Sequence, residues 1–317
     1  QEYLIRAGVL QPDELAAYDE KVQARLKQSL DEVRASEPPP VELGAEPTER
    51  EWQPDLEPVA ADRLTAWNER LLTWPEEFTP HPKVEGVLGR RRGMLAGEQP
   101  IDFATGETLA FASLVADGVP VRLAGQDSGR GTFSQRHAAL YDAKTAKRYV
   151  PLNHLQDGQA PFQVIDSLLS EEAAMGFEYG YSVATPRGLT LWEAQFGDFV
   201  NGAQIQIDQF LAAGEAKWQQ KSSLVLLLPH GYDGQGPEHS SARLERFLQL
   251  CAENNLRVAM PSAAASYYHL LRAQALDPEK RPLVVLTTKS LLRAEDAGDA
   301  PAELDGGGGE GGVGCSG

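Results

Sequence analysis

From about residue 100 onward, the chain alternates helical sequence patterns with short runs of apolar residues. Each run is apolar throughout rather than at every second position, which is typical of strands buried on both faces of a parallel sheet. The alternation therefore predicts an α/β fold, with one parallel sheet covered by helices on both faces. Helices are expected at 105–117, 170–184, 200–213, 241–254 and 264–276, and strands at 119–124, 189–193, 223–228, 256–260 and 283–287.

The sequence on either side of this region has a different character. Apolar residues recur at helical spacing within residues 3–34, and a stretch rich in proline and acidic residues follows at 36–61. A second helical pattern lies around 64–72. The last 24 residues contain nine glycines and no apolar period, which predicts disorder. We therefore expect a helical segment and linker at 1–61, an α/β domain at 62–293 and a disordered tail at 294–317.

The charge balance limits the partners of the chain. The formal net charge is −17; residues 1–60 carry −8 (14 acidic and 6 basic side chains) and residues 294–317 carry −6 (six acidic and no basic), leaving −3 for residues 61–293. Binding to a nucleic-acid backbone needs clustered lysine and arginine, so a nucleic-acid partner is not expected. No apolar run reaches the roughly 20 residues of a membrane span, and no signal peptide is visible. Two cysteines, Cys251 and Cys315, form no disulfide framework, which favours a reducing compartment.

The stretch from Leu226 to Leu250 joins an apolar strand to an amphipathic helix through a loop rich in proline and glycine. In a parallel α/β sheet such a loop lies at the carboxyl end of its strand, where these sheets bind ligands. The loop carries His230 and His239. Histidine is the side chain best suited to proton transfer near neutral pH, so the pair points to chemistry at this edge.

Other loops expected at the same edge also carry polar and aromatic residues. Glu171 opens the helix at 170–184, where a first-turn carboxylate is usually only a partner of the helix dipole. A glycine-bearing loop spans Gly125–His137, and a strand-to-helix junction holds Gln195, Phe196, Asp198 and Phe199. Aromatic side chains at such a junction either fill the core or stack on a flat ligand. The residues alone thus predict a domain that binds a small, polar, partly flat ligand, with a carboxylate and histidines for proton transfer.

Five collinear strings carry a family resemblance: GQDSGRGTFSQRHA (125–138), DSLLSEEAAMGFEYGYS (166–182), LTLWEAQFGDFVNGAQIQIDQF (189–210), LLLPHGYDGQGPEHSSARLERFLQLCAE (226–253) and RPLVVLTTKSLLR (281–293). Together they closely resemble the thiamine-diphosphate-dependent first component of the 2-oxoglutarate dehydrogenase complex. The resemblance covers about residues 62–293 and implies the domain that binds the aminopyrimidine ring of the cofactor. This domain is shared with the wider transketolase and pyruvate dehydrogenase group.

The resemblance implies catalytic roles for three residues. Glu171 stands where the family keeps the glutamate that hydrogen-bonds the aminopyrimidine ring nitrogen and favours its imino tautomer. His230 and His239 match the loop that faces the substrate. They are expected to aid proton transfer during decarboxylation and during passage of the succinyl group to lipoamide, without an individual role for either.

The resemblance also implies contacts to the cofactor. Phe199, with Phe196 as a second candidate, matches the aromatic that stacks on the pyrimidine, and Gln195 and Asp198 match supporting polar contacts. In this family the diphosphate and Mg²⁺ are bound through a GDG sequence followed downstream by asparagine, on a separate domain. No GDG occurs in this chain, so no metal ligand is expected in it.

The implied activity is oxidative decarboxylation of 2-oxoglutarate with reductive succinylation of the lipoyl group of the dihydrolipoamide succinyltransferase component, in the tricarboxylic acid cycle. It requires a homodimer, thiamine diphosphate and Mg²⁺, and the bacterial cytoplasm is favoured over the mitochondrial matrix. Because the family chain is longer and this one lacks the GDG domain, the fragment alone is expected to be inactive. The alternative is a non-catalytic pyrimidine-type domain that serves as a binding or assembly module, or as half of a two-chain 2-oxo acid dehydrogenase.

Overall fold

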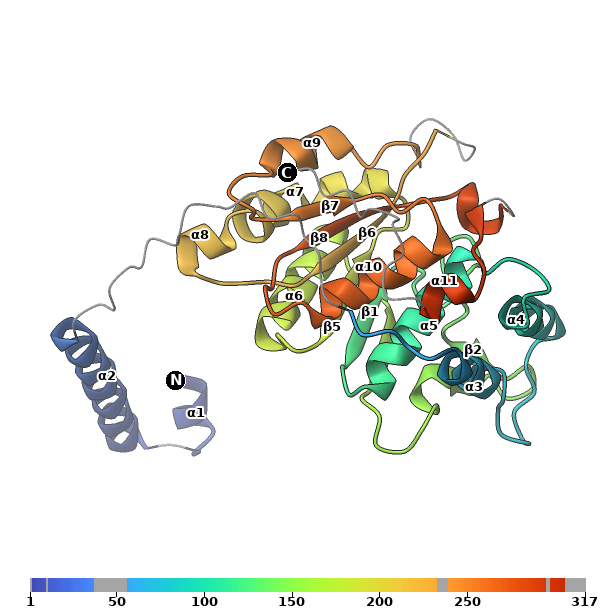
Figure 1. The fold of residues 1–317 in the computed structure, drawn as a ribbon. Helices are drawn as coiled ribbons and strands as arrows, with labels where there is room; N and C mark the ends of the chain where they lie inside the picture. The colour runs from blue at the N-terminus through green and yellow to red at the C-terminus, as the bar shows by residue number, and fades with distance from the viewer. Residues whose placement is uncertain (1, 10, 37–55, 233–238, 295–296, 306–317) are drawn as a thin grey trace. The chain divides into compact units, whose positions relative to one another are not determined.

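The computed structural model describes residues 2–9, 11–36, 56–232, 239–294 and 297–305 (Figure 1). The chain divides into two compact units, Gln1–Glu49 and Arg50–Gly317. The first unit contains α1 (Glu2–Arg6) and α2 (Pro12–Ala35). The helical pattern of residues 3–34 thus forms two helices, because Gly8 adopts a left-handed φ of 69° and Pro12 starts a new helix. Most of the predicted linker, residues 37–55, lies outside the described residues.

The second unit is built on a parallel six-stranded sheet with strand order β4-β1-β5-β6-β8-β7. The strands are β1 (Val121–Gly125), β4 (Phe162–Asp166), β5 (Leu189–Glu193), β6 (Val225–Pro229), β7 (Arg257–Ala259) and β8 (Leu283–Thr287). The predicted fold class is therefore confirmed. The strand β4 was not predicted from the sequence. It lies at the edge of the sheet and alternates buried with exposed residues, so it lacks the wholly apolar pattern of the other strands.

Helices cover both faces of the sheet, and alternate strand residues point to opposite sides. Val225 and Leu227 belong to the apolar cluster under α5 (Phe103–Ala116) and α10 (Ala264–Leu276). Leu226 and Leu228 belong to a second cluster, under α6 (Glu171–Ala184) and α9 (Leu244–Leu250). Figure 1 shows α5 and α10 on the near side of the sheet.

The prediction of one regular helix at 200–213 is wrong. The segment consists of a 3₁₀ helix η2 (Gly197–Ala203), one turn of α-helix α7 (Gln204–Gln206), a π-helical turn η3 (Ile207–Leu211) and α8 (Gly214–Trp218). Asn201 and Gly202, both poor helix formers, lie in the 3₁₀ part. The predicted helix at 241–254 is shorter than expected, because α9 ends at Leu250.

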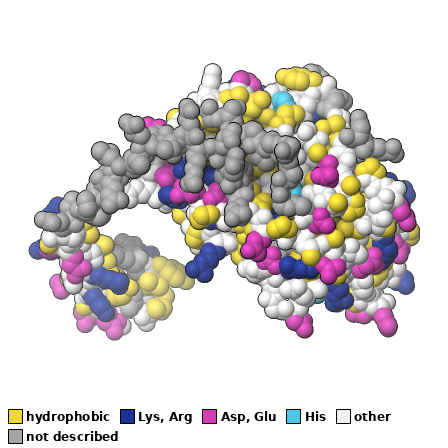
Figure 2. Space-filling view, in the orientation of Figure 1, with side chains coloured by type: hydrophobic (Ala, Val, Ile, Leu, Met, Phe, Trp, Pro, Cys, Tyr) yellow, Lys and Arg dark blue, Asp and Glu magenta, His cyan; other side chains and the backbone are white. Residues whose placement is uncertain are grey.

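Smaller elements complete the described chain. They are α3 (Ala61–Leu71), α4 (Pro82–Leu95), the two-residue strands β2 (Leu140–Tyr141) and β3 (Arg148–Tyr149), and the 3₁₀ turns η1 (Pro151–Asn153) and η5 (Leu291–Arg293). Exposed ion pairs such as Arg63–Asp117 lie among these elements. Figure 2 shows acidic and basic side chains interspersed on the surface around α3 and α4. In the part of the chain that the structure describes, no helix is long and apolar enough to cross a membrane.

The prediction of a disordered tail from residue 294 is wrong for residues 297–305. Ile101 and Asp299 exchange backbone hydrogen bonds, and α11 (Ala302–Asp305) follows. The Leu304 side chain is fully buried in the cluster under α5 and α10. A single leucine in an otherwise polar stretch gives no periodicity, so this contact left no helical pattern in the sequence. The glycine-rich run from residue 306 lies outside the described residues.

Replacing Leu304 with alanine is expected to lower the free energy of unfolding by about 2–3 kcal/mol, because it leaves a cavity in a closed core. Urea denaturation of the whole chain measures the change. The matched control is Leu276→Ala at the end of α10, where the side chain is 42% exposed; its change should stay within about 0.5 kcal/mol. Equal, small changes in both variants would show that α11 contributes nothing to stability.

Candidate functional site

The carboxyl ends of four neighbouring strands bring the predicted loops together. The strands β1, β5, β6 and β8 end at Gly125, Glu193, Pro229 and Thr287, and adjacent members of this set pair in parallel. The loops that the sequence predicted to converge, after β1, β5 and β6 and before the helix that Glu171 opens, therefore do so at one edge of the sheet. The turn after β8 joins them there.

Glu171 lies in a cavity at this edge. It is the first residue of α6, whose amino terminus is capped by the Ser170 side chain. One carboxylate oxygen of Glu171 accepts a hydrogen bond from Gln126 Nε2 at 2.9 Å. Gln126, Gln195 and Trp192 also line the cavity. A half-buried carboxylate is thus held by a neutral amide, with a second amide, that of Gln195, in the same cavity.

Phe196, Phe199 and His239 form an aromatic cluster. The His239 ring stacks on Phe196 with centroids 4.2 Å apart and planes at 16°. Phe199 meets the same imidazole edge to face, with centroids 5.7 Å apart, and Phe133 meets Phe196 at 5.8 Å. The structure therefore brings together one predicted histidine and both predicted phenylalanines. Phe199 also meets Phe196 edge to face, with ring centroids 6.0 Å apart.

His230 is fixed by backbone groups on two sides. Its N–H donates to the Thr287 carbonyl at 2.9 Å. Its Nδ1 accepts a hydrogen bond from the Ala242 N–H at 3.0 Å. A ring nitrogen that accepts a bond carries no proton, so the neutral imidazole holds its proton on Nε2. His230 is therefore arranged to donate a hydrogen bond through Nε2. Residues 233–238, between the two histidines, lie outside the described residues.

Gly197 and Asp198, in the segment after β5, contact the segment that follows His239. Asp198 Oδ2 accepts a bond from the Ser241 N–H at 3.4 Å, while Oδ1 is buried and has no hydrogen-bond partner in the described part of the chain. A Cβ on Gly197 would come within 2.6 Å of the Ala242 Cβ, so only glycine permits this approach. Gln195 Nε2 donates to Asp127 Oδ2 at 3.0 Å.

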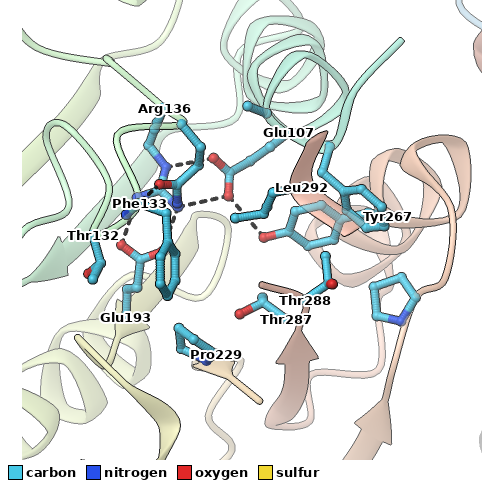
Figure 3. A pocket seen from close by; sticks show the side chains of 14 residues that line it. Glu107, Thr132, Phe133, Arg136, Glu193, Pro229, Tyr267, Thr287, Thr288 and Leu292 are labelled. Atoms are coloured by element: carbon cyan, nitrogen blue, oxygen red, sulfur yellow. Dashed lines mark hydrogen bonds and ion pairs between the residues drawn. The ribbon is translucent and has the colours of Figure 1, made fainter. Parts of the chain in front are cut away.

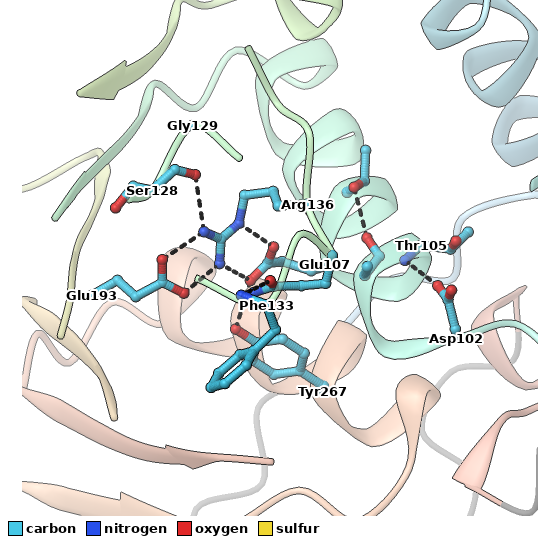
Figure 4. A network of polar contacts seen from close by, with 12 residues as sticks. Asp102, Thr105, Glu107, Ser128, Gly129, Phe133, Arg136, Glu193 and Tyr267 are labelled. Atoms are coloured by element: carbon cyan, nitrogen blue, oxygen red, sulfur yellow. Dashed lines mark hydrogen bonds and ion pairs between the residues drawn. The ribbon is translucent and has the colours of Figure 1, made fainter. Parts of the chain in front are cut away.

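A buried ionic network beside these residues was not predicted. The Arg136 guanidinium donates to both oxygens of Glu107 (2.6 and 2.9 Å) and of Glu193 (2.7 Å each). Tyr267 donates to Glu107 at 2.9 Å, and the Ser128 carbonyl accepts from Arg136 at 3.0 Å (Figure 4). The one sequence signal was Glu107 itself, the only charged residue in the apolar stretch FATGETLAFASLVA.

Burial and the two carboxylates set the protonation of this network. Burial alone would lower the pKa of Arg136, but Glu107 and Glu193 outweigh it and hold that pKa well above its usual value. Burial raises the pKa of Glu193, and attraction to Arg136 only partly offsets this. Burial, reinforced by Glu107, also raises the pKa of Tyr267 well above its usual value. The guanidinium and the phenol thus keep their protons throughout the physiological range.

A second cavity borders the network (Figure 3). Its walls include Phe133, Thr132, Pro229 and Thr287, together with the network residues Glu107, Arg136, Glu193 and Tyr267. Glu193 also lines the cavity that holds Glu171, so one side chain belongs to the walls of both. Among the described residues, no group of three or more His, Cys, Asp or Glu side chains is arranged to hold a metal ion.

Comparison with known proteins agrees with this geometry. Residues 99–295 match the family model described as the transketolase pyrimidine binding domain. Over 243 residues the chain is 57% identical to the 2-oxoglutarate dehydrogenase E1 component of Cupriavidus necator, covering 75% of this chain and 26% of that protein. Over 248 residues it is 54% identical to the E1 component of Brucella anthropi, covering 78% of this chain and 25% of that protein.

The chain therefore spans about a quarter of the length of these relatives. The resemblance read from the five sequence strings is confirmed: the chain belongs to the family of transketolase pyrimidine-binding domains, and it is homologous to that domain of 2-oxoglutarate dehydrogenase E1 components.

Proposed function

We propose that the chain is the pyrimidine-binding portion of a thiamine-diphosphate-dependent 2-oxoglutarate dehydrogenase. One observation carries the proposal. Glu171, at the start of α6, lies in a cavity with Gln126 and Gln195, in a chain 57% identical to an E1 component over its aligned residues. A carboxylate in such a place suits a short hydrogen bond to a weakly basic ring nitrogen.

The residues present fit the aminopyrimidine end of the cofactor. Glu171 would hold the ring nitrogen, and Phe199 would stack on the ring. The buried Asp198 Oδ1, which has no hydrogen-bond partner among the described residues, offers an acceptor for a ligand N–H. When bound, thiamine diphosphate supplies the electron sink that decarboxylation of a 2-oxo acid needs. Mg²⁺ and the diphosphate would be held by a separate domain, as the sequence comparison with the family implies.

The two histidines take different parts in this proposal. His230, whose Nδ1 accepts the Ala242 N–H and whose neutral ring therefore carries its proton on Nε2, would donate a hydrogen bond to an oxygen of the bound 2-oxo acid. His239, stacked on Phe196, would carry protons to and from the same region. Both would act on the substrate rather than on the pyrimidine, because they match the loop that faces the substrate in the family.

The proposal extends to the assembly. In a homodimer of the whole enzyme, the diphosphate-binding domain of one subunit would complete the cofactor site on the pyrimidine-binding domain of the other. The product succinyl group would pass to the lipoyl-bearing dihydrolipoamide succinyltransferase component. Residues 62–293 would form the pyrimidine-binding α/β domain, preceded by the helical segment and linker at 1–61. The related E1 components named above come from bacteria, which supports work in a bacterial cytoplasm.

A chimeric enzyme tests the function. The aligned segment of the Cupriavidus necator E1 component is replaced by residues of this chain, and CO₂ release from 2-oxoglutarate is measured. Because 57% of the aligned residues are identical, the chimera is expected to fold, dimerise and decarboxylate. The unmodified Cupriavidus enzyme is the reference. A folded, dimeric chimera without activity would favour the non-catalytic binding module instead.

A further inference from the structure

We propose that Lys289 is a positioning residue that holds the two histidine-bearing ends of the 230–239 loop together. Its ammonium group donates to the Gly231 carbonyl at 2.6 Å and to the His239 carbonyl at 3.0 Å. Two positions eight residues apart in the sequence thus meet at one nitrogen. The role of Lys289 in catalysis rests on the proposed function, whereas its role in loop geometry does not.

We call the two bonds from Lys289 to the Gly231 and His239 carbonyls the clamp. The turn after β8 adds further bonds beside it. The Thr287 carbonyl accepts the N–H of His230 at 2.9 Å, two residues before Lys289. The Gly231 N–H donates to the Ser240 carbonyl at 2.9 Å, which closes the base of the loop a second time. One short turn of the chain, from Thr287 to Lys289, therefore holds the backbone at both histidines.

A lysine suits this position because an ammonium has three donors and no acceptor. Two carbonyl oxygens that approach each other repel, and a shared cation removes that repulsion while forming two charge-assisted hydrogen bonds. Fixing the His239 carbonyl also fixes the direction of its side chain, and the imidazole then stays on Phe196. Loss of the ammonium should therefore release His239 from that ring while the sheet remains folded.

Lys280 provides a matched control. It lies between α10 and β8, is also half-buried, and donates from Nζ to a backbone carbonyl, that of Ala275, at 3.0 Å. Unlike Lys289, it donates to no carbonyl among the described residues of the histidine loop. Lys280→Met thus removes an equivalent bond without touching the clamp, and Lys289→Arg keeps a cationic donor at the clamp.

The test is NMR spectroscopy on the whole chain, which needs no catalytic activity. In Lys289→Met, nuclear Overhauser contacts between His239 and Phe196 are expected to disappear, and the ring-current shift of the His239 imidazole protons should be lost. Amide exchange at Gly231 should accelerate on the order of 10–100-fold. Lys289→Arg should retain the contacts, and Lys280→Met should match the unmodified chain.

Unchanged His239–Phe196 contacts in Lys289→Met would overturn the proposal. Should that variant fail to fold, Lys289→Gln is examined, and failure of both to fold would show that Lys289 supports the sheet rather than the loop. The outcome is separable from the proposed function, since an inactive chimera leaves the NMR result unaffected and a disproved clamp leaves decarboxylation possible.

Discussion

Replacing Arg136 with methionine is expected to lower the free energy of unfolding by about 3–5 kcal/mol. The guanidinium is 2% exposed and is the shared partner of Glu107 and Glu193. Without it, two buried carboxylates lose their counter-charge and face each other across the space it occupied. Leaving a charge buried without its partner costs far more than the intact pair contributes.

Thermal unfolding followed by circular dichroism measures this loss, which corresponds to a midpoint lower by about 6–20 °C for a domain of this size. Arg63→Met is the control, because its ion pair with Asp117 is 47% and 42% exposed and is worth at most about 1 kcal/mol. Adding Glu107→Gln and Glu193→Gln to Arg136→Met should recover much of the stability. Equal melting midpoints for Arg136→Met and Arg63→Met would contradict this account.

The same variant should show a distinct pH dependence. Burial raises the pKa of Glu193, so the folded state binds this proton more tightly than the unfolded state. Stability then falls as the pH rises from the unfolded carboxyl pKa, about 4.3, through the folded one. Without Arg136 the opposing attraction is gone and the fall is larger. Arg136→Met should thus lose less stability at pH 5 than at pH 8, and an equal loss at both would argue against buried carboxylate charge as the cause.

The largest effect on activity is expected for Glu171→Gln in the chimeric enzyme. Glutamine has nearly the shape of glutamate, and its carbonyl can still accept the bond from Gln126. It cannot share a proton with a ring nitrogen, so CO₂ release should fall by about 10²–10⁴-fold. The fold should be unchanged, as measured by circular dichroism and the melting midpoint.

Glu172→Gln is the matched control for this prediction. Glu172 is the next residue in the first turn of α6 and its side chain is exposed. Its replacement removes the same charge from the same helix terminus, so a general electrostatic effect would appear in both variants. Activity that survives Glu171→Gln, or falls equally in both variants, would refute the role proposed for Glu171.

The parts of the fold predicted from sequence are those with strong local patterns. The boundaries of α10 and β8 coincide with the predicted ranges 264–276 and 283–287, because each is a continuous apolar or periodic segment. The strands β2 and β3, of two residues each, are too short to show a pattern. The buried Leu304 in α11 was missed because packing against residues distant in sequence, not local periodicity, holds it.

The candidate site divides in the same way. Both histidines could be proposed because they lie in the loop after a predicted strand, and Glu171 because the family resemblance gives that position a role. The hydrogen bond from Tyr267 to Glu107 joins residues 160 positions apart, and no local sequence pattern predicts it. Lys289 likewise acts on a loop about 50 positions earlier, through backbone carbonyls that are the same for every residue type. Contacts of this kind require the assembled structure.

The network around Arg136 has a consequence for how the domain folds and unfolds. Its members come from four separate places: α5, the loop after β1, the end of β5, and α10. A partly assembled domain that buried three of them without the fourth would carry an unsatisfied polar group or an unpaired charge in its interior. Such intermediates are raised in free energy relative to both end states. The network therefore makes unfolding more cooperative, so that the whole six-stranded sheet should unfold in a single transition.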